Sequence, residues 1–252
     1  MRVAIVENTR VTHHGQVGVA LHEAAAQIDL YKPWLDGRLP ALGSFDALVV
    51  FGGEQNALAD DTHPYLPDLA GLMAEAAAQN HATLGICLGS QLMARGLGAQ
   101  NHINAAPEFG WCEITLTPEG QSDPVLRHLP PIFPIFQWHS DTFTLPQGAT
   151  HLAHSPSVPS QCFRTNRAAY AMQFHFEASR AVVADWTRTF PALMESAEPG
   201  WQANHPALSQ TIGAQADAHG LALARAWVGL RRASPALVLP ANAPVAHILS
   251  TR

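Results

Sequence analysis

The stretch TLGICLGSQLMARG, residues 83–96, constrains the fold more strongly than any other part of the chain. It is typical of a short apolar strand that runs into Gly85, Cys87 and Gly89 and continues at once as a helix. A direct turn from strand to helix forces unusual backbone angles on the corner residue, and side chains at its second neighbours would clash. Glycines at those two positions avoid the clash, so the spacing predicts a sharp strand-to-helix corner with Cys87 at its tip.

Strand and helix patterns alternate through the first half of the chain. The expected strands cover 2–7, 28–33, 45–53 and 82–86, and the expected helices cover 16–27, 64–79 and 89–97. Strands that alternate with helices of this length predict a parallel sheet with helices on both faces.

The pattern changes after about residue 107. The β-rich runs are 110–118, 135–146, 150–155 and 168–177, the expected helices are 178–194 and 206–232, and the Pro/Ala-rich tail is 234–252. Runs separated by Pro and Gly favour antiparallel strands added to a sheet edge. We therefore predict an α/β fold with an open, mostly parallel sheet and antiparallel edge strands. One domain would cover residues 1–195, and residues 196–252 would form a helical extension and tail packed on the same domain.

Composition excludes several functional classes. The net charge of −6 gives no basic face for nucleic acid. The single lysine, Lys32, precedes Pro33, which excludes a Walker-type phosphate loop. We see no secretory signal and no apolar run long enough to cross a membrane. The three cysteines are widely spaced and form no CxxC pair, which suits a reducing cytoplasm, where we expect the protein to be located.

The histidines show no spacing of metal ligands. His13 and His14 are adjacent in sequence rather than four residues apart, and the chain contains no HExxH motif. We therefore expect neither a metal nor a cofactor. Cys112 and Cys162 lie in β-rich runs and are expected to fill the core.

The corner at Cys87 has the spacing of a nucleophile elbow, G-x-C-x-G. An elbow presents the sulfur at the carboxyl edge of the sheet, where open α/β folds bind their ligands. Amides at the start of the following helix favour a thiolate, and the N–H of Leu88 would point toward a developing oxyanion. The alternative is a buried cysteine whose glycines merely allow a strand and a helix to pack closely.

A second candidate element is MQFHFE, residues 172–177. On a strand, His175 and Glu177 project from one face while Phe174 and Phe176 point to the other. His175 would act as the base for a cysteine nucleophile, and Glu177 would orient its ring. The alternative is an edge strand whose polar residues face solvent.

A third element is the glycine pair in VVFGGEQN, residues 49–56. It follows an expected central strand and lets the backbone approach a ligand closely, so the N–H of Gly53 could supply a second oxyanion donor. Taken alone it is only a turn.

Together these motifs resemble the class I, triad-type glutamine amidotransferases. GICLGSQ at 85–91 is similar to that family's G-x-C-x-G-x-Q signature, and FHFE at 174–177 is similar to its F-H-P-E strand. The stretch 62–99, PEFGW at 107–111 and QWHSDTFTLPQGATHLAHS at 137–155 resemble stand-alone, GMP-synthase-like members. The resemblance covers roughly residues 3–190.

The resemblance implies a flavodoxin-like sheet and a role for each matching residue. The implied triad is Cys87, His175 and Glu177; the implied oxyanion hole is Gly53 and Leu88; the implied substrate-binding residues are Gly52, Gln91, His139, Ser140 and Asp141. The alternative interpretation, which does not use the resemblance, is that Gln91 is an amide on a helix surface and that His139 and Asp141 are ordinary polar residues at a strand end.

Two positions depart from the family's pattern. Phe176 and Glu54 stand where most relatives have proline. A carboxylate at position 54 could select a substrate amine or repel a second carboxylate. Both departures bear on the substrate more than on the fold.

Three functions remain open at this stage. The first is a glutaminase that releases glutamate and ammonia through a γ-glutamyl thioester and passes the ammonia to a separate synthase chain. The second is a stand-alone hydrolase of γ-glutamyl amides or peptides. The third is a catalytically silent binding module. The two enzymatic functions imply a small-molecule substrate, either glutamine or another γ-glutamyl compound, and neither nucleic acid nor a membrane is an expected partner.

Overall fold

The computed structural model describes residues 1–230, so the predicted tail at 234–252 and the predicted helix end at 232 lie outside the described residues. The strands are β1 (Arg2–Val6), β2 (Gln27–Tyr31), β3 (Ala47–Val50), β4 (Ala82–Ile86), β5 (Asn101–His102), β6 (Glu108–Leu116), β7 (Ile132–His139), β8 (Thr142–Phe143), β9 (Thr150–His154), β10 (Cys162–Thr165) and β11 (Ala169–Met172). The helices are α1 (Gly15–Glu23), α2 (Pro33–Asp36), α3 (Leu66–Ala78), α4 (Leu88–Gly96), α5 (Pro118–Ser122), α6 (Arg180–Thr189), α7 (Pro191–Ala197), α8 (Trp201–Gln210) and α9 (Ile212–Gly229).

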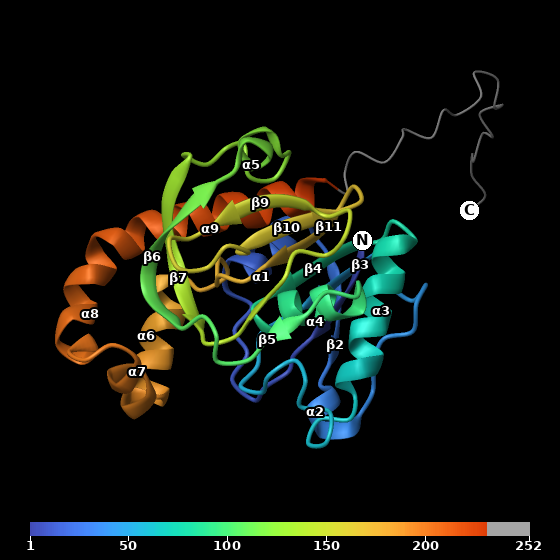
Figure 1. Ribbon diagram of the computed structural model, residues 1–252, viewed down its shortest axis with the longest axis horizontal. Helices are drawn as coiled ribbons and strands as arrows, with labels where there is room; N and C mark the ends of the chain where they lie inside the picture. The colour runs from blue at the N-terminus through green and yellow to red at the C-terminus, as the bar shows by residue number, and fades with distance from the viewer. Residues whose placement is uncertain (231–252) are drawn as a thin grey trace, which may run out of the picture.

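The larger sheet has the strand order β2-β1-β3-β4-β11-β10-β9-β6-β7 (Figure 1). Strands β2, β1, β3, β4 and β11 run parallel to one another, and the pairs from β11 onward (β11–β10, β10–β9, β9–β6 and β6–β7) are antiparallel. The residues of β3 and β4 are all buried, as is typical of parallel strands covered on both faces. The predicted mixed sheet, parallel at its centre with antiparallel additions at one edge, is confirmed.

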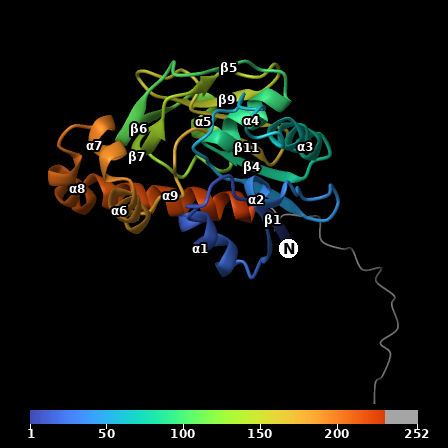
Figure 2. The same cartoon turned by 90° about the horizontal axis from the view of Figure 1, so that it is seen from below.

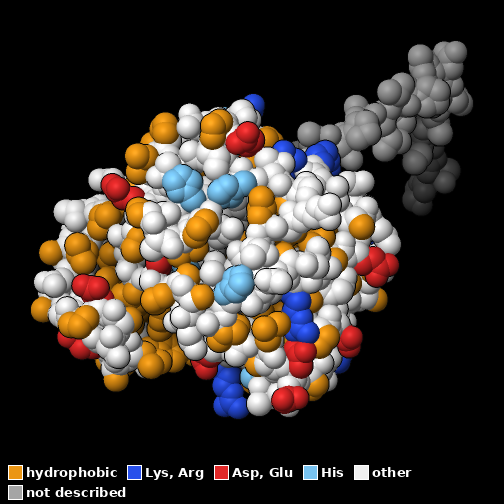
Figure 3. Space-filling view, viewed as in Figure 1, with side chains coloured by type: hydrophobic (Ala, Val, Ile, Leu, Met, Phe, Trp, Pro, Cys, Tyr) orange, Lys and Arg blue, Asp and Glu red, His pale blue; other side chains and the backbone are white. Residues whose placement is uncertain are grey.

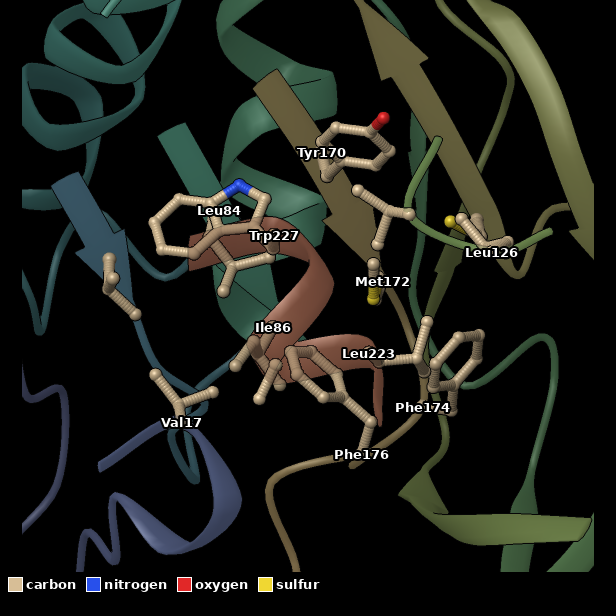
Figure 4. Packing of buried hydrophobic residues seen from close by; sticks show 14 of the residues in the cluster. Val17, Leu84, Ile86, Leu126, Tyr170, Met172, Phe174, Phe176, Leu223 and Trp227 are labelled. Atoms are coloured by element: carbon tan, nitrogen blue, oxygen red, sulfur yellow. The ribbon is translucent and has the colours of Figure 1, made fainter. Parts of the chain in front are cut away.

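Helices cover both faces of the parallel strands (Figure 2). Helices α1 and α9 pack on one face, and α3 and α4 pack on the other. Figure 4 shows the first of these cores, where Leu84 and Ile86 of β4 lie with Leu223 and Trp227 of α9. Burying side chains of this size stabilises the fold by about 1.5–3 kcal/mol each. Helix α9 therefore belongs to the main hydrophobic core.

Both helices predicted after residue 177 are interrupted. The first is divided into α6 and α7 at Phe190. Pro191 is the first residue of α7, a position where proline's missing N–H costs the helix no hydrogen bond. The second is divided at Thr211, whose φ of −106° and ψ of −92° are not helical. Helix α8 begins at Trp201, earlier than predicted.

The β-rich runs also end earlier than predicted. Strand β11 ends at Met172, and beyond it His175 forms only an isolated bridge with Phe136. The run predicted over 135–146 is divided into β7 and the short β8. Short elements such as α2 and β5 carry too few residues for a periodic signal and were missed by the sequence analysis.

The carboxyl ends of the parallel strands meet along one edge of the sheet. The glycine loop follows β3, Cys87 follows β4, and the segment with His175 follows β11. Adjacent strands lie about 4.7–4.9 Å apart, so three segments distant in sequence are brought together here. Within residues 1–230, no helix combines the length and the apolar composition needed to cross a membrane.

Candidate active site

Cys87 occupies a strained corner between β4 and α4. Its φ of 51° and ψ of −110° lie outside the regions that non-glycine residues favour, and it is 7% exposed. A Cβ on Gly85 would come within 2.4 Å of the Gly89 carbonyl oxygen, and one on Gly89 within 2.1 Å of the Val50 carbonyl oxygen. Both glycines are therefore required by close backbone contacts, as the sequence analysis expected.

His175 and Glu177 form a buried pair. The distance from His175 Nδ1 to Glu177 Oε1 is 2.7 Å, and both side chains are less than 10% exposed. Phe174 and Phe176 lie in the core instead (Figure 4). The His175 N–H donates to the Phe136 carbonyl at 2.8 Å, which fixes the backbone beyond the end of β11.

Cys87 and His175 meet across Gly52. A Cβ built on Gly52 would lie 3.4 Å from both Cys87 Cβ and His175 Cε1, so a side chain here would crowd the two groups. Burial of His175 opposes its charged form, but the charges of Glu177 and Cys87 and hydrogen bonds to both outweigh burial and raise the pKa of His175 well above its usual range. The site therefore favours the charged form of His175.

The expected oxyanion donors border the same space. Leu88 is the first residue of α4, where amide groups have no acceptor within the helix. Gly53 packs so closely that an added Cβ would lie 2.9 Å from both Leu88 Cδ2 and Asn8 Cβ. The Asn8 amide donates to the Phe51 carbonyl at 2.8 Å and supports the glycine loop.

The remaining expected substrate-binding residues also border the cavity. Gln91 is buried rather than on the helix surface, and its Nε2 donates to Gln173 Oε1 at 3.2 Å. The ring of His139 contacts the Asp141 carbonyl at 3.0 Å, and Asp141 Oδ1 accepts from the Asn104 N–H at 2.8 Å. Ser140 is exposed.

One cavity of about 520 Å³ connects all of these groups. The ten residues singled out from the sequence all line it: Gly52, Gly53, Cys87, Leu88, Gln91, His139, Ser140, Asp141, His175 and Glu177. Among the residues that the structure describes, none of those lining the cavity is a lysine or an arginine. Backbone N–H groups and histidines must therefore provide the positive potential that an anionic ligand needs there.

A buried polar network behind His139 was missed by the sequence analysis. Glu108 lies 3.1 Å from His139 Nε2 and accepts hydrogen bonds from Ser155, Ser157 and Gln161. Burial opposes its ionisation, but hydrogen bonds from His139 and the two serines keep the pKa of Glu108 below its usual value. Glu108 lies within the PEFGW motif, which carried no signal of this role. The network holds His139 at the cavity.

An apolar wall on the opposite side of the cavity was also missed. It consists of Trp138, Trp186, Phe190 and Leu193. The last three residues are spaced four and three apart, as on one face of a helix, which is the signal that could have revealed them. Figure 3 shows apolar side chains gathered at the lower left, over the region that α6 and α7 occupy in Figure 1.

The two departures from the family's pattern have different surroundings. Phe176 is 1% exposed and packs in the core, so the alternation of side chains is preserved. Glu54 lines the cavity, and its Oε1 accepts a hydrogen bond from Thr9 Oγ1 at 3.0 Å. The Glu54 carboxylate therefore lies at the cavity but is held by the loop that follows β1.

The fold and the cavity define an α/β protein with a buried cysteine at a strand-to-helix corner, beside a buried histidine–glutamate pair. A profile of the family described as "Glutamine amidotransferase class-I" matches residues 16–183. The chain belongs to this family, and the membership indicates glutamine amidotransferase activity in general.

Individual relatives agree with this assignment. The glutamine amidotransferase-like protein YfeJ of Salmonella typhimurium is 31% identical over 180 residues, which cover 64% of this chain and 75% of that protein. The glutamine-hydrolyzing GMP synthase subunit of Methanoregula boonei is 27% identical over 68% of this chain and 89% of its own. A glutamine amidotransferase from Thermotoga maritima has the same fold, with a TM-score of 0.80, 24% identity and coverage of 91% and 97% of the two chains.

Proposed function

We propose that the chain hydrolyses a γ-carboxamide through a thioester on Cys87, with His175 and Glu177 as the other members of a catalytic triad. The observation that carries this proposal is the buried series of contacts from Glu177 to His175 and on to Cys87 at a strained corner. Such a series activates a thiol that would otherwise be a weak nucleophile at neutral pH.

In the first half of the reaction, Cys87 Sγ attacks the carboxamide carbon and the C–N bond then breaks. The amide N–H groups of Gly53 and Leu88 stabilise the negative oxygen of the tetrahedral intermediate. His175 gives its proton to the leaving nitrogen, and ammonia or an amine departs. Glu177 keeps the ring oriented and stabilises its charged form.

In the second half, the same histidine activates water. Water adds to the γ-glutamyl thioester, the C–S bond breaks, and glutamate leaves while Cys87 is regenerated. Gln91, His139, Ser140 and Asp141 would hold the amino-acid end of the substrate, with Gly52 leaving room for the reacting carbonyl. The buried contacts of His139 with Glu108 support this role, because they hold the ring at the cavity.

The fate of the nitrogen admits two candidates. Several relatives are named as glutamine-hydrolyzing subunits of GMP synthase, and these names support transfer of ammonia to a separate synthase chain. The apolar wall beside His175 supports the second candidate, hydrolysis of γ-glutamyl amides by the chain alone.

The first experiment is an assay of glutamate and ammonia release from glutamine by the purified chain, with Cys87→Ala as the control. We expect turnover that disappears in the variant. Turnover that persists in Cys87→Ala would overturn the proposal.

Thiol alkylation gives an independent test. Burial, followed by the charges of Glu108 and Glu198, raises the pKa of Cys112 to about 11. Burial and Asp123 raise the pKa of Cys162 well above its ordinary value. At neutral pH we therefore expect iodoacetamide to modify Cys87 first, as read by peptide mass spectrometry. No turnover together with no selective modification would exclude Cys87 as a nucleophile.

A further inference from the structure

The position of the leaving nitrogen follows from the proposed chemistry. His175 must reach that nitrogen to protonate it, so any group attached to the nitrogen lies beside His175. The ring of Trp186 stands edge-on to the His175 ring, with 5.3 Å between centroids and 79° between planes. A substituent on the leaving nitrogen would therefore meet Trp186.

Trp186 is the start of a continuous apolar surface. The ring of Trp138 lies 5.5 Å from Trp186 and 5.8 Å from Phe190, measured between centroids. The Trp138 carbonyl oxygen lies 3.8 Å from Cys87 Sγ, so the surface begins next to the nucleophile. It ends at Leu193, which lines the cavity and is 61% exposed.

The two ends of the cavity differ in character. Gln91, His139 and Asp141 supply polar groups at the end expected to hold the amino acid. The opposite end is aromatic, and its α6–α7 residues lie beyond the part of the chain that the family profile matches. Ammonia is small and polar and gains nothing from an aromatic wall, whereas an apolar group would remove this surface from water.

Charge narrows the choice of substituent. Within the described part of the chain, the lining residues include Glu54 and Asp141 but no lysine or arginine. A carboxylate on the amine portion, as in a γ-glutamyl peptide, would find no lysine or arginine to pair with, in a cavity that Glu54 also lines. His13, whose ring lies near that of Trp186, is already paired with Asp185 at 2.9 Å. An uncharged apolar or aromatic amine meets neither difficulty.

We propose that the preferred substrate is a γ-glutamyl amide whose nitrogen carries an uncharged apolar group of aromatic size, bound by Trp138, Trp186, Phe190 and Leu193. This proposal rests on the proposed function, since it uses the same triad. The C–N bond to the substituted amine breaks as the C–S bond forms, His175 protonates the amine, and water then releases glutamate. The balance is γ-glutamyl amide plus water giving glutamate plus a primary amine.

The test compares glutamine, γ-glutamyl ethylamide, γ-glutamyl phenethylamide and γ-glutamyl phenylalanine on the full chain. The two amides differ by one phenyl ring, and the last two compounds differ by one carboxylate. We expect kcat/KM for the phenethylamide to exceed that for the ethylamide by at least about tenfold. We expect kcat/KM for γ-glutamyl phenylalanine to be lower than that for the phenethylamide by at least about tenfold, because of its added carboxylate.

Leu193→Ala tests the wall without disturbing the core, since the side chain is largely exposed. We expect it to lower the ratio of phenethylamide to glutamine kcat/KM by about three- to tenfold. Leu35→Ala is the matched control, because Leu35 is 69% exposed and does not line the cavity. It should leave the ratio unchanged.

The outcomes separate the two proposals. Hydrolysis of glutamine with equal rates on the two amides, and no effect of Leu193→Ala, would overturn the aromatic substrate and keep the triad. No turnover of any of the four compounds, with Cys87 still modified selectively by iodoacetamide, would overturn the aromatic substrate alone. No turnover and no selective modification would overturn the proposed function and this proposal together.

Discussion

Glu177 controls the charge of its histidine neighbour more directly than any other residue of the site. It lies 2.7 Å from His175 Nδ1, and its charge is the largest influence that raises the pKa of His175 against the effect of burial. Removing that charge while keeping the shape isolates its contribution. Glu177→Gln makes this change.

We expect Glu177→Gln to lower the pKa of His175 and to reduce kcat/KM on glutamine by about 10²–10⁴-fold, as in other triads that lose the orienting carboxylate. An NMR titration of the imidazole reports the pKa directly. Asp185→Asn is the control, because Asp185 pairs with the partly exposed His13 and has no contact with Glu177. An unchanged pKa of His175 in Glu177→Gln would contradict this account.

The same pKa shift predicts how stability depends on pH. The folded pKa of His175 is raised above the unfolded value of about 6.5, so the folded state binds more protons between these two values. The stabilisation is therefore complete below about pH 6.5 and is lost as the pH rises through the folded pKa. Urea denaturation should show this loss in the native chain and a smaller one in Glu177→Gln.

The candidate residues could be found from sequence because each follows a recognisable strand. Cys87 and the glycine pair carry local patterns that depend on backbone geometry alone. The cavity wall depends instead on how α6 and α7 pack against β7. The spacing of Trp186, Phe190 and Leu193 places them on one helical face, but it does not say what that face covers. Glu108 was missed for the same reason, since its partners Ser155 and Gln161 lie 47 and 53 residues away.

At the level of elements, helix α9 supports the backbone that carries Glu177. A Cβ on Gly220 would lie 2.1 Å from the Phe176 carbonyl oxygen. From the other side, the Gln16 N–H at the start of α1 donates to the Glu177 carbonyl at 2.9 Å. The Gln16 side chain also donates to the Asp217 carbonyl of α9 at 3.3 Å. The segment 176–177 is thus held between α1 and α9.

We expect Gly220→Ala to reduce kcat on glutamine by about tenfold or more, because the methyl group must displace the backbone next to Glu177. Gly229→Ala is the matched control on the same helix, where an added Cβ meets nothing within 4 Å. It should keep full activity and gain up to about 1 kcal/mol of stability.

Circular dichroism and the pH profile of kcat separate positioning from simple loss of folding. A folded Gly220→Ala chain with a shifted profile would indicate a displaced Glu177. A folded Gly220→Ala chain with native kcat and native profile would contradict the role assigned to α9.

Element boundaries show where sequence patterns lose their information. The parallel half of the sheet was predicted because its apolar strands and amphipathic helices alternate locally. The break at Thr211 and the end of β11 at Met172 depend on tertiary contacts, such as the hydrogen bond from the His175 N–H to Phe136. In the antiparallel half, consecutive strands pair within β9–β10 and β6–β7, but the two pairs are joined by β6 and β9, which are far apart in sequence and which composition cannot match.

In the whole molecule, stability and chemistry are carried by separate polar clusters. The Asp123 side chain is fully buried outside the cavity lining and accepts hydrogen bonds from Arg164 Nε at 2.9 Å and Tyr170 Oη at 3.0 Å. It also accepts from the Val125 N–H at 2.8 Å. These bonds tie the connection after α5 to strands β10 and β11, next to the central strand β4.

We expect Asp123→Ala to lower the free energy of unfolding by about 3–5 kcal/mol, because it leaves a partly buried guanidinium and a buried hydroxyl without their acceptor. The activity of the chain that remains folded should be unchanged, since Asp123 does not line the cavity. Glu23→Ala is the matched control, because the Glu23–Arg225 pair is exposed and such pairs contribute little. Urea denaturation and active-site titration, performed on the same samples, measure both quantities. A drop in kcat per folded molecule would mean that the Asp123 cluster also shapes the site, and equal stability of the two variants would show that burial adds nothing to this ion pair.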